Sequence, residues 1–391
     1  MKRRVLHVVW QLNAGGIAHW LMNVLRHIDR TRYRLDFMVL RDEPCAFEDE
    51  IRSLGGEVIT CPGHRNPWRF ARRFAEMLRA HGPYDVVHSH VYNYSGFILM
   101  LAARQAIPVR IAHSHTDIRV EEAGRPLWRR LYLGLTMRWI RQSATARVGV
   151  SAGAVESLYG SAWRRDAGVR IIPPGLDFTP FGQPVDRAAV RRSLGLSAND
   201  LVIGHVGNYV WAKNHHFLIE VAACLARREP RARLLLIGDG LLNSDIDERV
   251  RALNLADRIR LIGPRDDVPR LMIGAMDGFL FPSHYEGFGL VLIEAQAAAL
   301  PCVVATGVPE ETQVIPELIR RLPLSNSPDA WAAAVLEGIA RRTIPQSEAY
   351  GRMLQSPCHI DKCVAALAEI YETSNEGAVV LRRTEVPDGA H

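Results

Sequence analysis

Short apolar runs alternate with longer amphipathic stretches along most of the chain. In the first half, the runs rich in Val, Ile and Leu cover residues 4–10, 35–40, 57–60, 85–90, 109–115 and 146–151. Stretches with a helical period, such as residues 17–28 and 69–80, lie between them. Near-continuous apolar runs are typical of parallel strands that are buried on both faces, with helical crossovers covering the sheet. The first half therefore predicts a doubly wound α/β domain.

The same alternation begins again after a proline-rich stretch at residues 169–181. Its apolar runs cover residues 201–207, 232–240, 259–264, 277–283 and 301–306. We therefore expect an α/β fold with two Rossmann-like, doubly wound domains, residues 1–178 and 179–358, that face a cleft. The amphipathic stretch 359–373 is expected to pack back on the first domain as a helix, and the aperiodic residues 374–391 to form a mobile tail.

The composition is typical of a soluble globular protein. Of the 391 residues, 48% are hydrophobic and 23% are charged. No apolar run reaches the roughly 18 residues that are needed to span a bilayer. The six cysteines have neither the density of a disulfide framework nor paired metal-ligand spacing. Reduced thiols in a cytoplasmic protein are therefore expected.

Charge is divided unevenly between the two halves. Residues 1–175 carry 26 Lys and Arg against 15 Asp and Glu, or +11, and residues 176–391 carry 22 against 27, or −5; together these give the net charge of +6. A basic first half suggests an anionic partner. A general drift toward arginine is the alternative, because the chain has 45 arginines and only three lysines.

The stretch HYEGFGLVLIEAQAAALP, residues 284–301, combines glycines and acids in an otherwise apolar segment. Gly287 and Gly289 lie where a predicted strand turns into a helix, so backbone N–H groups and the positive helix end could hold a phosphate. Glu294 lies among apolar residues of that helix, where an unpaired carboxylate is costly. A ribose diol suits this acid as a partner. An arginine of the same domain, or a position at the wet edge of the helix, are the alternatives.

Three other positions follow predicted strands. Lys213 lies after the run 201–207 and immediately before a helix, and its compact charge suits a diphosphate oxygen, although an incidental surface lysine is the alternative. Gly15 and Gly16 form either a close-approach loop or a plain turn after the first strand. Gly238 in the GDG stretch allows the same two interpretations.

Two pairs of histidines end neighbouring predicted strands. His113 and His115 share one face by the period of two of a strand. Only one of them can lie at the strand tip, and we expect this to be His115. His88 and His90 repeat the pattern one strand earlier, where a satisfied core histidine is the simpler explanation.

We expect no metal site. The SDIDE stretch contains an Asp-x-Asp sequence, but Ser244 is expected to cap a helix whose first turn holds Asp245 and Asp247. No cluster of His, Cys and carboxylates elsewhere has metal-ligand spacing along the sequence.

The stretch at residues 125–142 is amphipathic in an unusual way. A 3.6-residue period places its large apolar side chains on one face, with Arg130 and Arg141 opposite. These apolar residues are Trp128, Leu131, Tyr132, Leu135 and Trp139. The stripe is expected to be buried within its own domain; the alternative is that the helix lies on an anionic membrane.

Taken in order, these segments resemble the retaining glycosyltransferases of family 4, which have the two-domain GT-B fold. The stretch FPSHYEGFGLVLIEAQAAALPCVV resembles the E-x7-E signature of that family. Six further stretches follow in family order: GGIAHWLMNVLRHID, DVVHSHVYNYSG, PVRIAHSHTD, HVGNYVWAKNHHFLIEVA, ARLLLIGDGLL and IRLIGPRDDVPRLMIGAMD. The likeness extends from about residue 4 to about residue 372 and is greatest to the branch of bacterial exopolysaccharide and capsule gene clusters.

The resemblance implies roles for individual residues. Glu294 would hold the donor ribose, Glu286 the hydroxyls of the donor sugar, and His115 would contact that sugar near the reacting carbon. The backbone that would embrace the donor diphosphate belongs to Gly287, Phe288, Gly289 and Leu290. The glycines that would border the donor are Gly15, Gly16 and Gly238.

One position departs from the family pattern. The family usually has a Gly-Arg pair where this chain has Gly207 and Asn208. Asn208 removes one positive charge from the expected phosphate clamp, which Lys213 would share. Arg265, in the loop that resembles the base-contacting segment of the family, is the candidate to replace that charge.

The sequence therefore predicts a retaining hexosyltransferase that needs no cofactor or metal. Its partners would be a nucleotide diphosphate-sugar donor, such as a UDP-sugar, and a lipid-linked or other saccharide acceptor, and no nucleic acid. We expect a cytoplasmic protein that is peripheral on the inner face of the membrane and acts in exopolysaccharide or capsule synthesis. The alternatives are a nucleotide-sugar epimerase of the same fold and a catalytically silent nucleotide-sugar-binding partner of another transferase.

Overall fold

The structure is a computed structural model, and it describes residues 2–13, 15–42, 44–119, 126–341 and 344–373. The chain divides into two compact units. Unit 1 comprises residues 1–172 and 364–391, and unit 2 comprises residues 173–363. The divisions predicted from the sequence, after residues 178 and 358, lie a few residues from these boundaries. The tail expected at residues 374–391 lies outside the described residues.

Unit 1 is built on a parallel sheet with the order β3-β2-β1-β4-β5-β6-β7 in its described part. The strands are β1 (Arg3–Val9), β2 (Tyr33–Val39), β3 (Val58–Thr60), β4 (Val86–Ser89), β5 (Val109–Ser114), β6 (Ala146–Gly149) and β7 (Val169–Ile171). The helices are α1 (Gly16–His27), α2 (Glu48–Ser53), α3 (Pro67–His81), α4 (Ser95–Arg104), α6 (Leu127–Ser143) and α7 (Ala152–Tyr159). The order reverses between β1 and β4, so this unit has the doubly wound topology that the alternating pattern predicted.

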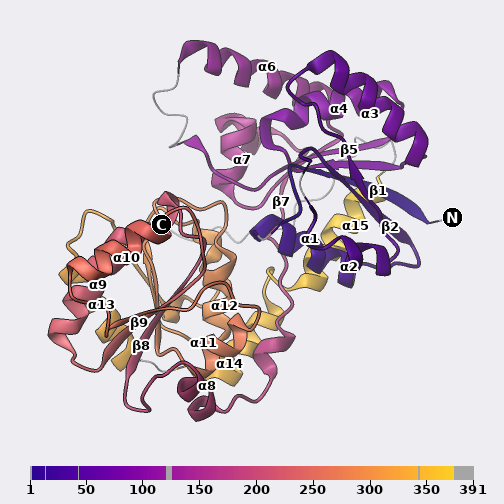
Figure 1. Ribbon diagram of the computed structural model, residues 1–391. Coiled ribbons are helices and arrows are strands. Elements are labelled where there is room, and N and C mark those ends of the chain that lie inside the picture. The colour runs from indigo at the N-terminus through magenta and orange to yellow at the C-terminus, as the bar shows by residue number, and fades with distance from the viewer. Residues whose placement is uncertain (1, 14, 43, 120–125, 342–343, 374–391) are drawn as a thin grey trace. The chain divides into compact units, whose positions relative to one another are not determined.

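Helices cover both faces of this sheet (Figure 1), with α3, α4 and α6 on one face and α1 and α2 on the other. Alternation along β1 decides which residues meet them. Leu6 and Val8 belong to the core that includes Phe70 and Phe74 of α3. His7 points to the other face, where its ring stacks on Phe37 at 5.3 Å between centroids.

The last helix, α15 (Ile360–Tyr371), begins in unit 2 and ends in unit 1. Its C-terminal end is fixed by polar contacts with the sheet of unit 1. The Tyr371 hydroxyl lies 3.0 Å from Nδ1 of His88, and the Tyr33 hydroxyl donates to Glu372 at 2.6 Å. The chain therefore returns to its first domain at its end, as Figure 1 shows in yellow.

Unit 2 repeats the architecture with the parallel order β10-β9-β8-β11-β12-β13 in its described part. The strands are β8 (Leu201–Val206), β9 (Ala232–Ile237), β10 (Ile259–Leu261), β11 (Gly278–Phe281), β12 (Cys302–Ala305) and β13 (Ile319–Leu322). The helices are α8 (Arg187–Ser193), α9 (His215–Arg228), α10 (Asn243–Ala252), α11 (Val268–Gly274), α12 (Leu290–Ala297), α13 (Pro328–Ala340) and α14 (Gln346–Gln355). Helices α9, α10 and α13 lie on one side of this sheet, and α8, α11, α12 and α14 on the other (Figure 1).

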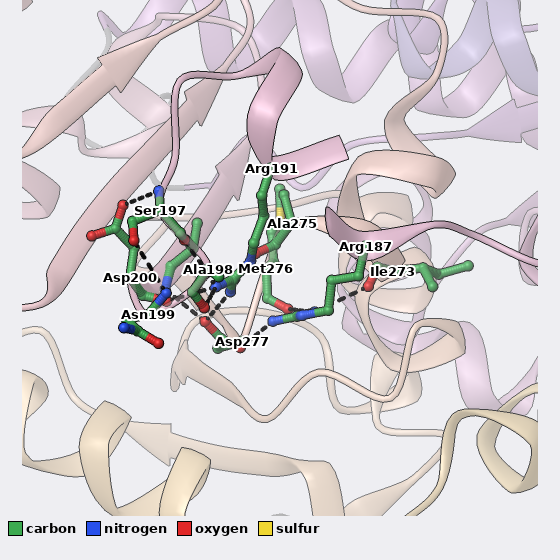
Figure 2. Close-up of polar contacts among 11 residues, drawn as sticks. Arg187, Arg191, Ser197, Ala198, Asn199, Asp200, Ile273, Ala275, Met276 and Asp277 are labelled. Carbon is green, nitrogen blue, oxygen red and sulfur yellow. Dashed lines mark hydrogen bonds and ion pairs between the residues drawn. The ribbon is translucent and has the colours of Figure 1, made fainter. Parts of the chain in front are cut away.

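An arginine network holds α8 to the amino ends of β8 and β11 (Figure 2). Asp277 precedes β11 and accepts hydrogen bonds from Arg187, from Arg191 at 2.7 Å and from the backbone N–H of Val202 at 2.8 Å. The buried Arg191 guanidinium also donates to the carbonyls of Ala198 and Ala275. These acceptors replace the water that the Arg191 guanidinium loses on burial. The network lies at the amino ends of the strands, on the opposite edge of the sheet from the carboxyl ends.

Two strands at the sheet edges were not predicted. The sequence assigned Val169–Ile171 to the linker and gave no strand at Ile319–Leu322, but these segments form β7 and β13. Both are short, and their residues are only partly buried or exposed. These two edge strands lack the continuous apolar run that identifies a buried parallel strand, which is why the pattern missed them.

Most of the apolar stripe of α6 is exposed, so the expectation that it is buried within its own domain was wrong for all of its residues except Trp139, whose ring lies 6.1 Å from that of Phe97 of α4. Trp128 and Leu131 are 65% and 67% exposed, respectively, and Leu127 is 69% exposed. The helix packs on α4 through Thr136, Trp139 and Ile140, of which Thr136 and Ile140 are buried. Among the helices of the described residues, none has both the length and the apolar character to cross a bilayer.

Candidate active site

Two loops at the carboxyl ends of β8 and β11 carry most of the predicted residues. The loop after β8 and the loop after β11 are joined by the backbone N–H of His284, which donates to the carbonyl of Ala212 at 2.8 Å. The Asn214 side chain donates to the carbonyl of Pro282 at 3.2 Å, and the rings of Trp211 and His284 stack at 4.2 Å. The loops therefore form one packed surface within unit 2.

Lys213 and Glu286 form an ion pair across these loops. Lys213 Nζ lies 2.5 Å from Glu286 Oε1, and the two side chains are only 18% and 11% exposed. The ammonium also lies 5.2 Å from the ring centroid of Phe281, a cation–π distance. Taking both charges out of water has a cost that their attraction barely offsets, so the pair contributes little to stability. Lys213 is therefore not an incidental surface lysine.

The glycine-containing turn leads directly into α12. Gly289 has φ of +94° and is the residue before the helix, and a Cβ at this position would approach the Phe281 ring to 3.3 Å. Phe288 is buried and anchors the turn. Because the first N–H groups of a helix have no partner within it, and because the helix dipole is positive at this end, the turn is suited to bind an anion.

Glu294 is the fifth residue of α12 and has buried neighbours in Leu292 and Ile293. Its side chain is partly exposed, and the described residues give its carboxylate no hydrogen bond or ion pair. Burial raises the pKa of Glu294 to about 7. The alternative that this acid pairs with an arginine of its own domain is therefore not observed, and an acid poised near neutrality is a feature of functional sites.

Gly238 is required by packing. Its φ is +143°, and a Cβ would lie 2.1 Å from the carbonyl oxygen of Gly207. The backbone N–H of Gly207 donates to Ile237 at 3.0 Å, and that of Tyr209 donates to Asp239 at 2.8 Å. The GDG stretch therefore fixes the position of the loop after β8, which is a structural reason for the glycine beside the role that the resemblance implied.

The two other residues of the expected phosphate clamp lie at the surface. Asn208 is exposed and follows Gly207. The Arg265 guanidinium donates two hydrogen bonds to Asp267, at 2.8 and 3.0 Å, and holds the pKa of that carboxyl below its ordinary value. Arg265 would have to leave Asp267 to replace the missing arginine charge, and an exposed ion pair of this kind is weak enough to exchange.

In unit 1, Gly15 and Gly16 lie at the start of α1 after β1. Gly15 is the N-cap residue with an extended backbone, and a Cβ added there would meet no atom within 4 Å. The space at this position is therefore open, in contrast to the close packing of Gly238.

His115 follows the end of β5 and is partly exposed, whereas His113 is fully buried. His115 Nε2 lies 2.8 Å from Nδ1 of His90, and its ring packs against Trp20 at 5.2 Å. Burial lowers the pKa of His115 to about 3, so the imidazole is neutral at pH 7. A neutral ring in this position can donate or accept a hydrogen bond but does not supply positive charge.

The structure also gathers histidines that the sequence treated separately. His7, on β1, lies with Nδ1 2.9 Å from Nε2 of His90, and His88 Nε2 lies 3.0 Å from Nδ1 of His113. His88 and His90 are buried and bonded, as the simpler explanation required. The sequence did contain a signal for this cluster, because His-Ser-His occurs at the ends of two strands. Parallel pairing of those strands places the two segments next to each other.

The Asp-x-Asp stretch lies in α10, but its cap was predicted incorrectly. The helix begins at Asn243 after Leu242, so Ser244 lies inside the first turn together with Asp245. An acid in the first turn interacts favourably with the helix dipole, which accounts for its presence there.

Comparison with known proteins defines the class of fold. The crystal structure of HepE of Anabaena in complex with UDP superposes with a TM-score of 0.76 at 20% identity, covering 94% of this chain and 99% of that chain. Sucrose-phosphate synthase of Thermosynechococcus elongatus gives a TM-score of 0.73 at 19% identity, covering 95% and 98%. The two parallel-sheet α/β units are thus those of the GT-B glycosyltransferase fold.

Sequence comparison identifies the family. The model described as "Glycosyl transferases group 1" matches residues 186–350, and the model described as "Glycosyl transferase 4-like domain" matches residues 15–175. EpsF of Bacillus subtilis (strain 168), a protein assigned as a glycosyltransferase, is 34% identical over 380 residues, which cover 96% of this chain and 98% of EpsF. The chain therefore belongs to this glycosyltransferase family. An Escherichia coli protein named UDP-Gal:alpha-D-GlcNAc-diphosphoundecaprenol alpha-1,3-galactosyltransferase is 27% identical over 226 residues, which cover 57% of this chain and 58% of that protein.

Proposed function

We propose that this glycosyltransferase moves a hexose from a nucleotide diphosphate-sugar, with UDP as the first candidate nucleotide, to a lipid-linked saccharide during the synthesis of exopolysaccharide or another surface polysaccharide. The observation that carries the proposal is the arrangement in unit 2 of an anion-binding turn, a Lys–Glu pair and an unpaired acid. These three features suit the diphosphate, the sugar and the ribose of such a donor, respectively.

The donor would be bound part by part. The diphosphate, with its negative charge, suits the N-terminal end of α12 after Gly289 and the ammonium of Lys213. The ribose diol has two O–H donors that suit the acceptor oxygens of Glu294, which has no other described partner. Glu286, already held by Lys213, would then accept hydrogen bonds from the sugar hydroxyls.

The transfer is proposed to retain the anomeric configuration without a metal. The departing diphosphate would take the acceptor proton on the same face, and Lys213 would stabilise the charge that develops on the leaving group. His115 is assigned to the donor sugar by the resemblance alone, and its neutral ring suits a hydrogen bond to a hydroxyl. Because Asn208 supplies no charge, the diphosphate depends more strongly on Lys213 than it would with a Gly-Arg pair.

A lipid-linked acceptor is supported by two observations. The similar Escherichia coli protein is named for a diphosphoundecaprenol acceptor. In this chain, α6 exposes Leu127, Trp128 and Leu131, with Arg138 also at the surface. Exposed aromatic and aliphatic side chains beside arginines suit the interface of an anionic membrane, which we propose as the docking partner of this helix.

The reaction is tested by incubating the purified protein with UDP-sugars, with and without a membrane extract that contains lipid-linked saccharides. Release of UDP that depends on the extract supports transfer, and the anomeric proton coupling of the product in NMR shows whether configuration is retained. An epimerised donor without acceptor would instead identify an epimerase. Binding of UDP with no turnover across donors and extracts would identify a silent partner.

The membrane proposal has its own test. Leu131→Glu should reduce co-sedimentation with vesicles that contain phosphatidylglycerol, whereas Leu253→Glu, a similar change on a partly exposed leucine of unit 2, should leave it unchanged. Equal binding by the wild-type protein and Leu131→Glu would contradict the role of α6. A concentration-dependent change in oligomeric state that is lost in Leu131→Glu would assign the stripe to self-association instead.

A further inference from the structure

One face of the sheet in unit 1 carries five histidines, which are His7, His88, His90, His113 and His115. Ring nitrogens of His90, His113 and His115 all lie within 4.8 Å of one another. Their ring centroids are 4.1 Å apart for His113 and His115, 5.0 Å for His90 and His115, and 5.4 Å for His90 and His113. Three imidazoles around a tetrahedral zinc ion, with Zn–N bonds of about 2.0–2.1 Å, have centroids about 5 Å apart.

One of these rings has an unused nitrogen. His113 is fully buried, its Nδ1 is bonded to His88, and its Nε2 has no hydrogen-bond partner among the described residues. A buried polar atom without a partner requires an explanation, and an ion is one of the few available. If Nδ1 of His113 carries the proton and donates it to His88, then Nε2 presents a lone pair.

The outer nitrogens of His90 and His113, two of the three ligands, are held as they are in metal sites. His90 Nε2 lies 2.9 Å from His7 Nδ1, so its N–H has an acceptor while Nδ1 is left for a metal. His88 in turn has the Tyr371 hydroxyl on its Nδ1 at 3.0 Å. Metal-binding histidines nearly always donate their second ring N–H in this manner, which fixes the tautomer and the ring orientation.

From this arrangement we propose that His90, His113 and His115 form a binding site for a borderline-soft divalent cation of the Zn²⁺ class. Three nitrogen ligands leave a fourth position open. His115 is partly exposed, so water or a ligand can reach that position, and the ion has a route of entry. Binding requires the 2.8 Å hydrogen bond between His90 Nδ1 and His115 Nε2 to open to about 3.3 Å, the separation of two ligand atoms around tetrahedral zinc. The proton of that hydrogen bond must also move to Nδ1 of His115, the other tautomer of the neutral ring, so that Nε2 offers a lone pair.

The neighbouring group of His7, His88 and His90 is the weaker candidate. Its three rings are also close enough for a metal, but all of them are fully or almost fully buried. A divalent charge there would have no contact with water, and the residues whose contacts are described provide no carboxylate to balance it.

The site would regulate the proposed reaction and would take no part in it. Since His115 is assigned to the donor sugar, an ion bound to its Nε2 would remove that contact and inhibit transfer. This consequence rests on the proposed function, but binding of the ion does not. Zinc binding without inhibition would count against the role of His115, whereas the metal site itself is decided by binding alone.

The test uses the full-length protein, stripped with a chelator and titrated with Zn²⁺ alone by calorimetry. We expect one equivalent to bind, and His113→Gln or His115→Gln to weaken binding by more than the roughly tenfold to hundredfold that outer contacts contribute. His19→Gln, a change at an exposed histidine of the same unit, should have no effect. Substitution with Co²⁺ should give a spectrum of nitrogen ligation without a thiolate charge-transfer band, since the cysteines are not involved.

Two results would overturn the proposal. One is the absence of stoichiometric binding to the wild-type protein. The other is unchanged binding in His115→Gln, which lies at the exposed end of the cluster and tests the site even if His113→Gln fails to fold. Circular dichroism and thermal melting of each variant show whether a loss of zinc binding comes from the missing imidazole or from unfolding of the variant.

Discussion

Replacing Glu294 by glutamine should stabilise the protein and weaken donor binding. The Glu294 carboxyl has a pKa of about 7 because burial disfavours its charged form, against an ordinary value of 4.5. The folded state therefore binds an extra proton between these two values, and this contribution to stability is present below about pH 4.5 and is lost as the pH rises through about 7. At pH 8 the wild-type protein bears the cost of an ionised acid in an apolar setting, and Glu294→Gln does not.

The magnitude follows from the shift. A difference of about 2.5 pKa units at 1.36 kcal/mol per unit gives an upper value of about 3.4 kcal/mol. Since the side chain is partly exposed, water screens the charge and we expect about 1–3 kcal/mol. Glu294→Gln should therefore raise the melting temperature at pH 8 by a few degrees, and this difference should shrink as the pH is lowered to 5.

Donor binding should change in the opposite direction. The ribose hydroxyls donate to an ionised carboxylate, and a hydrogen bond to a charged group contributes about 1.5–3 kcal/mol, so UDP affinity should fall about tenfold to hundredfold in Glu294→Gln. In the wild-type protein, affinity should decline as the pH falls below about 7, by up to about tenfold per unit, and the variant should lack this component.

The assay is calorimetric titration with UDP between pH 6.5 and 8.5, beside thermal melts over pH 5–8. The phosphate of UDP also titrates near pH 6, and comparison with the variant removes that contribution because both proteins bind the same ligand. Glu248→Gln makes the same change at an exposed position of α10 and should alter neither property. Equal UDP affinity in Glu294→Gln and wild type, or a variant that melts lower at pH 8, would refute the reasoning.

Three further predictions concern single contacts. Lys213→Ala should slow turnover by roughly 10²–10³-fold through lost stabilisation of the leaving group. A wild-type rate of UDP release in this variant would show that Lys213 does not bind the diphosphate. Asp277→Ala should cost about 3–5 kcal/mol in urea unfolding, because it leaves the buried Arg191 without its carboxylate; UDP affinity of the folded variant should not change, and a loss under 1 kcal/mol would contradict this account. His115→Ala should lower kcat/KM about tenfold to hundredfold by removing a hydrogen bond to the donor sugar. Unchanged kcat/KM in this variant would show that His115 does not contact the sugar during the reaction.

The central strands of both units could be predicted from the sequence, because a parallel strand buried on both faces needs a continuous apolar run. Most of the central strands, such as Val5 to Val9 in β1 and Phe279 to Phe281 in β11, have this pattern. The edge strands β7 and β13 do not, since a short strand with one free edge is held by backbone pairing and needs few apolar residues.

The candidate site was predicted as a set of positions, and its contacts were not. The spacing of Gly289 and Glu294 follows from the local chain, because a turn and the helix after it are continuous in sequence. That Lys213 pairs with Glu286, and that Glu294 has no such partner in the described residues, depends on two loops that are 73 residues apart and are packed together by His284 and Ala212.

The sequence by itself determined the order of strands and helices, the glycine turn and the family, since these depend on local pattern and on motifs in order. Only the tertiary structure decided which groups have partners. Parallel pairing placed two His-Ser-His segments next to each other and brought His7 to them, and the packing of α6 on α4 through Thr136 and Ile140 left its larger apolar stripe exposed. Periodicity shows which residues share a face, but the neighbouring elements determine whether that face is covered.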